Sequence, residues 1–251
     1  MKNFILMIQF LTRIPINIKV DVDDKSFING IVYFPLVGLV VGILNVFFYL
    51  LSIRFLPVPI TAVLVTLFNV CLTGAFHLDG LSDTCDGIYS SRKRERMLEI
   101  MKDSRVGTNG AAAIFFDLAL RIVLLASLSK ADAVKALAVS AILSRTMIVL
   151  LSHIAQYARK EGGLGNYYIG KINLKTTIIA ILTAVLLSSV IIRWKAVFVV
   201  LPVILITFIY NIYIKSKIGG MTGDTLGAAV EFIEVLVFLI ILSLSHLAPL
   251  S

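Results

Sequence analysis

Apolar stretches close to the length of a membrane span constrain this chain more than any other feature of its sequence. A helix needs about 20 mostly apolar residues to cross about 30 Å of hydrocarbon. Of the 251 residues 59% are hydrophobic and 15% are charged, far more apolar sequence than a soluble domain needs. We predict an all-α, polytopic membrane helical bundle with about seven transmembrane helices plus interfacial helices, in one domain over residues 1–251. The predicted spans are 31–51, 58–76, 110–128, 132–154, 176–192, 196–214 and 226–248.

The distribution of Lys and Arg predicts how the chain is oriented. With the N-terminus in the cytosol, 16 of the 23 basic residues fall in inner segments and five in outer ones, while Arg121 and Arg145 fall within spans. Basic loops stay preferentially on the cytosolic side. We therefore expect a multi-pass protein of the cell (inner) membrane with its N-terminus inside. The net charge of +8 reflects this bias, so nucleic acid is not an expected partner.

Two amphipathic segments are expected to lie on the inner leaflet. Residues 1–11 have an apolar run but no small-residue cleavage site, which favours an interfacial helix over a signal peptide. Residues 92–102 alternate basic and apolar side chains, a pattern typical of a helix held by anionic lipid. The larger polar loops, 77–109, 155–175 and 215–225, all fall on the predicted cytosolic side, so we expect the function there.

The segment Phe76–Gly87 is the main candidate for chemistry. Asp79, Asp83 and Asp86 are spaced i, i+4, i+7, which puts them within about 60° of arc on a helix. Three like charges this close repel one another unless a cation binds them, and carboxylate oxygens are the ligands that Mg²⁺ prefers. The alternative is a solvated acidic helix face.

The next polar segment, residues 102–110, combines charge with a turn of small residues. Backbone N–H groups around Gly107 and Gly110 would point toward an anion at the start of the following helix. Asp103 is either a helix cap or part of a phosphate or metal site, and we favour the second. Lys102 and Arg105 are expected to bind a phosphate of the substrate, and we expect Asn109 to contact the substrate as well.

The last span carries acids that need a partner. Asp224 and Glu231 are seven residues apart and share a helix face, so both are candidate metal ligands. An unpaired carboxylate inside a membrane helix costs several kcal/mol. Glu234 is expected to pair with Arg121 or Arg145, unless it too joins the metal site. Asp117 and Arg121, at i, i+4, are expected to form a structural ion pair.

His77 precedes Asp79 by two residues. It is either an ordinary interfacial residue or a general base or metal ligand, and the sequence does not decide between these roles.

These motifs together resemble the cobalamin 5′-phosphate synthase family (adenosylcobinamide-GDP ribazoletransferase). They run in the family's order over nearly the whole chain. The matching segments are Thr12–Pro15, Tyr33–Gly38, Phe76–Gly87, Met101–Gly107, Ser144–Arg145, Gly162–Gly165 and Gly220–Ala228.

The resemblance implies a Mg²⁺-dependent inner-membrane enzyme. Its substrates would be adenosylcobinamide-GDP and α-ribazole or its 5′-phosphate, and its products adenosylcobalamin or its 5′-phosphate and GMP. In the hypothesis that follows, Lys102 and Arg105 hold the diphosphate, Arg145 also contacts substrate, and the sequence leaves a homo-oligomer open. The expected metal ligands are Asp79, Asp83, Asp86, Asp224 and Glu231, and the expected catalytic residues are His77, Asp83 and Asp103.

Two other functions compete with this one. CDP-alcohol phosphotransferases also have an Asp-Gly-rich metal motif on membrane helices, but theirs has an Ala-Arg pair after the first Asp-Gly and longer gaps before the later acids. A cation transporter would use Asp117, Glu231 and Glu234 as an ion path. Transporters often contain repeated halves and place such groups near mid-membrane. Here no repeat is visible, and the acids cluster at the cytosolic boundary.

Overall fold

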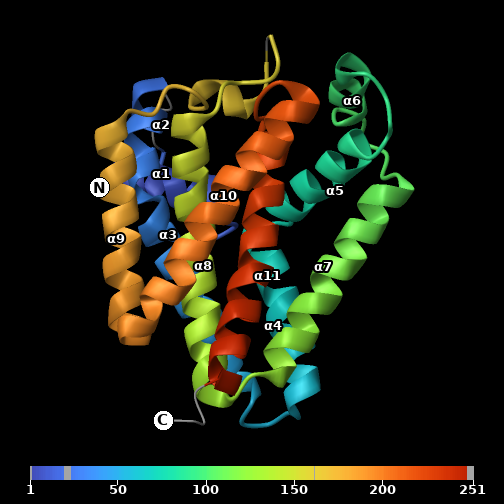
Figure 1. The fold of residues 1–251 in the computed structure, drawn as a ribbon. Coiled ribbons are helices and arrows are strands. Elements are labelled where there is room, and N and C mark those ends of the chain that lie inside the picture. Colours follow the sequence, from blue (N-terminus) through green and yellow to red (C-terminus); the bar gives the residue numbers. More distant parts are fainter. Residues whose placement is uncertain (1, 20–23, 161, 248–251) are drawn as a thin grey trace.

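The computed structural model describes residues 2–19, 24–160 and 162–247, and within these ranges the chain forms helices and no β-sheet. Figure 1 shows a bundle of long helices with short ones at one end. The α-helices are α1 (Lys2–Leu11), α2 (Asp24–Gly30), α3 (Phe34–Ser52), α4 (Val58–Thr73), α5 (Phe76–Ile88), α6 (Arg94–Ile100), α7 (Thr108–Ser127), α8 (Lys130–Ile154), α9 (Leu174–Ile192), α10 (Ala196–Ile218) and α11 (Gly223–Leu247). Three short 3-10 helices are η1 (Ile31–Tyr33), η2 (Leu164–Tyr167) and η3 (Arg193–Lys195).

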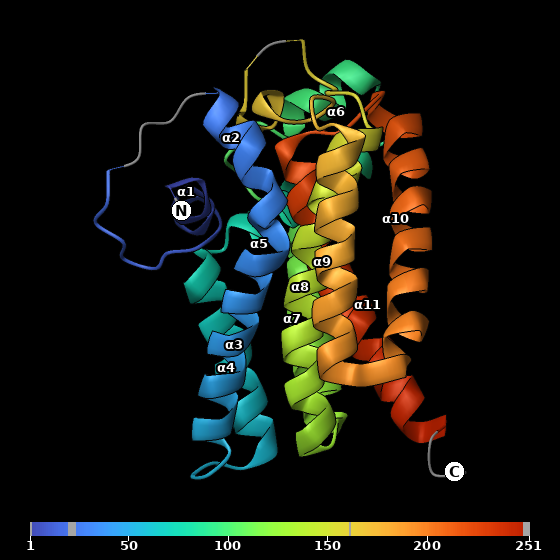
Figure 2. The same cartoon turned by 90° about the vertical axis from the view of Figure 1, so that its left-hand side faces the viewer.

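The predicted helical membrane bundle is confirmed, but the count of seven spans is not. Five helical stretches are long and apolar enough to cross a membrane, or six when the bent pair α4 and α5 is counted as one span. The stretch Leu174–Ile218 counts once because η3 joins α9 to α10 without a break. In Figures 1 and 2, however, α9 and α10 run side by side in opposite directions.

The core of the bundle forms around α8. In its apolar stretch 89% of residues are buried, whereas the corresponding fraction is 28% for α7 and for the α9–α10 stretch. The outer faces of α9 and α10 carry large exposed apolar side chains, among them Leu186, Val190 and Leu205. Such surface is stable against lipid and not against water, which agrees with a membrane location.

Both predicted interfacial segments are helical. Helix α1 lies across the bundle and is seen nearly end-on in Figure 2, with Met7 and Leu11 buried against its neighbours. Helix α6 is shorter than the predicted 92–102 segment and has Met97 as its buried anchor.

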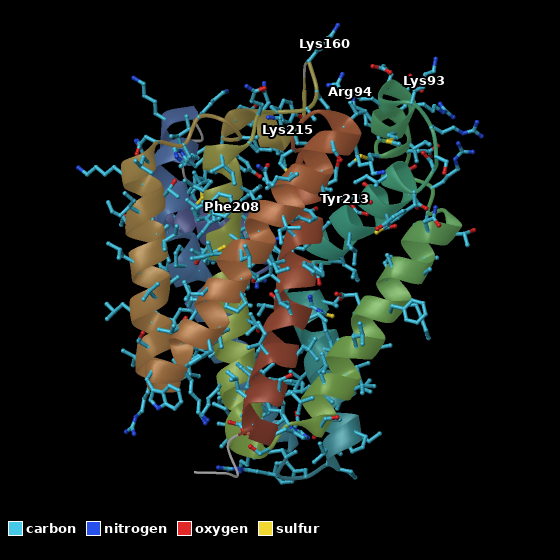
Figure 3. The ribbon with its side chains drawn as sticks, in the orientation of Figure 1. Lys93, Arg94, Lys160, Phe208, Tyr213 and Lys215 are labelled. Atoms are coloured by element: carbon cyan, nitrogen blue, oxygen red, sulfur yellow. The ribbon has the colours of Figure 1, made fainter. Side chains whose placement is uncertain are left out.

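The three polar loops predicted to share one face do meet at one end of the molecule. We call this end, which contains α6, η2 and the α10–α11 junction, the upper end (Figure 1). Backbone hydrogen bonds join Ala158 N to Met221 O and Met221 N to Gln156 O, both at 2.8 Å. The Arg94 guanidinium donates to the carbonyls of Ala158 and Ile218, each at 2.7 Å. In Figure 3 the labelled basic side chains Lys93, Arg94, Lys160 and Lys215 all lie at this end.

Close packing of α3 on α8 depends on glycine. A Cβ atom built on Gly42 would lie 2.9 Å from the Ala138 Cα, closer than real Cβ atoms approach backbone. We predict that Gly42→Val overpacks this contact and destabilises the protein by about 1–3 kcal/mol. The measurement is thermal unfolding in detergent. The control Ile43→Val changes the neighbouring side chain, which is 55% exposed on the outer face, and should leave the transition unchanged. Equal transitions for both variants would contradict the packing argument.

Candidate active site

A sharp bend positions α5, the helix that carries the acidic motif. The axes of α4 and α5 meet at 90°, and the bend is made by Gly74 and Ala75, whose φ angles of 64° and 57° lie in the left-handed region. Gly74 adopts this conformation without the penalty that a side chain would add. The N-terminal segment braces the bend, because the Arg13 backbone N–H donates to Leu72 O at 2.7 Å. As a result α5 crosses the upper part of the bundle instead of continuing along it (Figure 1).

The backbones of α5 and α11 touch where they cross. A Cβ atom on Gly80 would lie 2.7 Å from the Asp224 carbonyl oxygen, and one on Gly227 would lie 3.1 Å from the His77 carbonyl oxygen. Small residues permit this approach, as is common between membrane helices. The crossing brings Asp79, from the first turn of α5, next to Asp224, from the first turn of α11.

Asp79 and Asp224 line a cavity of about 140 Å³, which we call the acidic pocket. Its other walls include Arg159, Tyr157 and Gly165 from the 155–173 loop. The Arg159 side chain is 11% exposed and donates from Nη2 to Asp224 Oδ2 at 2.8 Å, while its buried Nε has no hydrogen-bond partner in the described structure. The pocket therefore offers carboxylates on one side and a guanidinium on the other.

Asp83 completes a group of close acids. It lies one turn after Asp79 and within electrostatic range of Asp79, Asp224 and Asp86, with Arg159 as the opposing cation. Three carboxylates against one guanidinium leave two excess negative charges beside the pocket. No three His, Cys, Asp or Glu side chains among the described residues already have the arrangement of a metal site. Oxygen donors with two excess negative charges nevertheless fit a hard divalent cation such as Mg²⁺, which keeps several waters among its ligands.

Asp86 has a different role from the one expected of it. It accepts hydrogen bonds from the backbone N–H groups of Gly107 at 2.7 Å and Gly110 at 2.9 Å, at the start of α7. The turn predicted to bind a substrate anion is thus occupied by the chain's own carboxylate. Since these bonds and the helix dipole stabilise its charge, Asp86 fastens α7 to α5, and we no longer assign it to the metal.

Asp103 and Arg105 form an exposed ion pair near the acidic motif. Arg105 Nη2 donates to Asp103 Oδ2 at 2.6 Å, and the Arg105 side chain is 87% exposed. Hydrogen bonds from Arg105 lower the pKa of Asp103 to about 2. A carboxylate with so low a pKa is a poor proton acceptor near neutral pH, so the predicted catalytic role of Asp103 is replaced by that of orienting Arg105. Lys102 and Asn109 are also exposed on this segment and lie at the same end of the bundle.

His77 is buried between α5 and the core, with 1% of its surface exposed. Neither ring nitrogen has a hydrogen-bond partner in the described structure. Because its ring is shut off from solvent, it is not positioned to remove a proton from a bound substrate, and we do not assign it the predicted general-base role.

Two predicted site residues belong instead to a buried ion-pair cluster deep in the bundle. This membrane-core cluster consists of Asp117, Arg121, Arg145, Glu231 and Glu234. Glu231 pairs with Arg121, which explains why it does not complete the acidic pocket. Arg145 pairs with Glu234 and is 0% exposed, so it does not contact a substrate at the upper end. The predicted Asp117–Arg121 pair is confirmed at 2.9 Å, and Glu234 pairs with both arginines.

Sequence reasoning missed Arg159 as a site residue. It was counted only among the cytosolic basic residues, and no spacing pattern connects it to Asp224, which lies 65 residues later. The one available signal was its position just before the Gly162–Gly165 motif. A larger cavity of about 330 Å³ lies at the opposite end of the bundle, but Lys135, Arg193 and Lys195 give it a basic lining with Asp132 as its single acid, which does not suit a metal.

The fold and the pocket define a class: an integral membrane protein with an acidic site at one end of its helical bundle. The comparisons with known proteins narrow this class. A model of the cobalamin-5-phosphate synthase family matches residues 3–242. The chain belongs to that family.

Similar proteins cover almost the whole chain. A protein of Clostridium novyi (strain NT) is 53% identical over 243 residues, covering 97% of both chains. One of Clostridioides difficile (strain 630) is 40% identical over 250 residues, covering 96% of both, and one of Thermoanaerobacter sp. (strain X514) is 38% identical over 245 residues, covering 97% of this chain and 98% of its own. All three are named adenosylcobinamide-GDP ribazoletransferase. No solved structure matches.

Unfolding measurements can test whether Asp86 caps α7 while Asp79 has no such structural role. We predict that Asp86→Ala lowers the free energy of unfolding by about 0.5–2 kcal/mol, because the start of α7 loses its cap. Asp79→Ala should leave stability unchanged or raise it slightly, since Asp79 is exposed among like charges. Thermal unfolding without added metal measures both. Equal losses in the two variants would rule out the capping role.

Proposed function

We propose that this chain is a Mg²⁺-dependent adenosylcobinamide-GDP ribazoletransferase. It would transfer the cobinamide phosphate group to α-ribazole or α-ribazole 5′-phosphate and release GMP. The substrates come from the names of its relatives. The observation that carries the chemical proposal is the meeting of Asp79, Asp83 and Asp224 around Arg159 at the α5–α11 crossing.

In this proposal the acidic pocket holds the metal and the reacting phosphate. Asp79 and Asp224 hold Mg²⁺, which when bound would neutralise negative charge on the diphosphate. Arg159 lines the pocket and is held by Asp224, so its guanidinium is preorganised to bind a phosphoryl oxygen. The exposed Lys102 and Arg105 meet the outer part of the diphosphate, and Asn109 lies beside them.

The chemical step forms one bond and breaks another. The ribazole hydroxyl oxygen bonds to the phosphorus that carries the cobinamide arm, and the bond from that phosphorus to the oxygen of GMP breaks. The hydroxyl proton passes to Asp83, the carboxylate next to Asp79 on the same helix face. Fixed cations around the phosphate stabilise the charge that grows on GMP as it leaves.

The location of the reaction is part of the proposal. We propose that the upper end is cytosolic and that the chain lies in the inner membrane with its N-terminus inside. The basic residues of the upper end support this orientation. Lipid surrounds the exposed apolar faces of α9 and α10, and the oligomeric state stays open.

The alternatives are weaker on specific grounds. A cation path would use three acids of the bundle, Asp117, Glu231 and Glu234. All three form ion pairs with Arg121, so their charges are already neutralised and a cation would meet a guanidinium. A CDP-alcohol phosphotransferase is disfavoured by the motif spacing. Turnover of a CDP-alcohol with an acceptor alcohol, without release of GMP from adenosylcobinamide-GDP, would favour that alternative.

Asp83→Asn should abolish turnover while the protein still inserts. We expect the rate of GMP release from adenosylcobinamide-GDP and α-ribazole 5′-phosphate to fall by about 10²–10⁴-fold, the usual contribution of acid–base catalysis. The protein is assayed in lipid, with and without Mg²⁺. Glu95→Gln, an exposed acid at the same end, is the control and should retain activity. Full activity of Asp83→Asn would refute the assignment.

Arg159→Gln tests the phosphate-binding role separately. Loss of one charge-assisted hydrogen bond is worth about 1.5–3 kcal/mol, so kcat/KM for adenosylcobinamide-GDP should fall about 10- to 100-fold. Its neighbour Lys160 is exposed and points away from the bundle in Figure 3, and Lys160→Gln should behave like the unchanged protein. Equal kinetics for the two variants would contradict the role of Arg159.

A further inference from the structure

The membrane-core cluster contains more acidic than basic side chains. Asp117 and Arg121 come from α7, Arg145 from α8, and Glu231 and Glu234 from α11. All five residues are buried, with exposed fractions of 7% or less. Three acids and two arginines leave one negative charge without a counter-charge. An uncompensated charge at this depth costs several kcal/mol, so the native cluster requires one more positive species.

No other charged side chain of the described structure supplies it. His77 of α5 is the remaining titratable group that faces the cluster. Burial of its ring disfavours a positive charge first of all, and of its charged neighbours Arg145 and Arg121 oppose that charge while Glu234 favours it. Helices α3 and α4 contribute only amides: Asn45 donates to Asn69 at 2.9 Å, and Asn69 donates to Glu234 at 3.4 Å. The lysines of α10, Lys215 and Lys217, lie at its upper end and are exposed.

A metal cation is a poor candidate for the missing charge. The cavity next to the cluster, lined by Asn45, Arg121 and Glu234, has a volume of about 20 Å³. That volume holds about one water molecule. The unpartnered acceptor Asn45 Oδ1 suits such a water. The Arg121 guanidinium on the cavity wall would repel a cation.

The positions of the Asp117 and Glu231 carboxyl groups indicate where the additional positive species, a proton, is bound. The two side chains meet on one guanidinium: Arg121 Nε donates to Asp117 Oδ2 at 2.9 Å, and Arg121 Nη2 donates to Glu231 Oε2. Two ionised carboxylates only accept hydrogen bonds and repel each other, so two carboxyl groups held this close in a buried site favour a hydrogen on one of them. Glu234, by contrast, accepts from both arginines, from Ser144 and from Asn69, which satisfies an ionised carboxylate fully.

We infer that Asp117 and Glu231 share one proton, so that the membrane core holds a buried carboxyl–carboxylate pair next to Arg121. With this proton the five side chains carry zero net charge. Asp117 and Glu231 lie on separate helices, and the shared proton therefore joins α7 to α11 directly. This site is distinct from the acidic pocket, because none of its five residues lines that cavity.

Infrared spectroscopy of the full-length protein in lipid tests the inference. A protonated carboxylic acid has a carbonyl stretch that is separate from carboxylate bands and shifts in D₂O. At neutral pH we expect difference spectra to show the loss of one protonated carboxyl per chain in Asp117→Asn, and the loss of the same band in Glu231→Gln. Both amides keep a hydrogen-bond donor in place of the protonated acid, so either variant retains the contact. Glu99→Gln, an exposed acid paired with Arg96, is the control and should retain the band.

The pH dependence of stability gives an independent readout on the unchanged protein. Because the folded state holds a proton that the unfolded chain releases at about pH 4, stability should fall as the pH rises from about 4 and level off once the folded state loses this proton. Asp117→Asn should remove that part of the decline, whereas the exposed-acid control Glu99→Gln should keep it. Overturning results would be an unchanged infrared band in both amide variants, or a melting temperature that depends on Na⁺ and not on pH.

Discussion

The contact between the backbones of α5 and α11 is the constraint on which the upper end of this protein depends. Gly80 and Gly227 allow the two helices to cross with no side chain between them, and the acids that matter most, Asp79 and Asp224, start from the two sides of that crossing. Neither helix could deliver its carboxylate alone, because α5 enters at a right angle after the Gly74–Ala75 bend, and α11 begins at the upper end. The 155–173 loop then closes the pocket by pairing its backbone with the α10–α11 junction, and this brings Arg159 to Asp224. The electrostatics of the pocket are thus a consequence of how closely two backbones approach.

Two groups of charges occupy this bundle, and their surroundings decide what each can do. The acidic pocket opens at the upper end, where water and ions reach it, so its excess negative charge can be met by a divalent cation. The membrane-core cluster is shut away from solvent, and there every carboxylate needs a partner within the protein. Arg121 alone contacts three acids from two helices. Because of this difference in solvent access, the acidic pocket is suited to binding a ligand and the membrane-core cluster to holding helices together. Both contain carboxylates and arginines. The difference also explains why Asp224 and Glu231, on one face of one helix, serve different sites.

Contacts between residues close together in the sequence could be predicted, whereas contacts between distant residues could not. The length of the apolar stretches identified the long helices, local spacing identified the i, i+4, i+7 acids of α5, and the family resemblance ordered the motifs correctly. The Asp117–Arg121 pair was also predictable, since its members are one turn apart. What a sequence does not contain is the relative rotation of distant helices. Glu231 was assigned to the metal because it shares a face with Asp224, but α11 is long enough for that face to cross from the pocket into the core. Asp86 was assigned there for the same kind of reason, yet its partners are backbone N–H groups 21 and 24 residues away. Arg159 was missed because its partner lies 65 residues further on.

The fastening of α7 by Asp86 links the acidic motif to the exposed basic segment that follows it. Because Gly107 and Gly110 both donate to Asp86, the turn after Arg105 is held against the side of α5. The exposed charged side chains of this segment are therefore held on the side of α5. A substrate with a diphosphate would meet a fixed guanidinium, Arg159, inside the pocket and exposed cations, Lys102 and Arg105, outside it. Long exposed basic side chains suit the capture of a charged group from water, whereas a buried and paired guanidinium suits its precise orientation. The acidic motif thus combines two functions within a single turn of helix: Asp86 holds the segment that follows it against α5, and Asp83 is left for the chemistry that we propose.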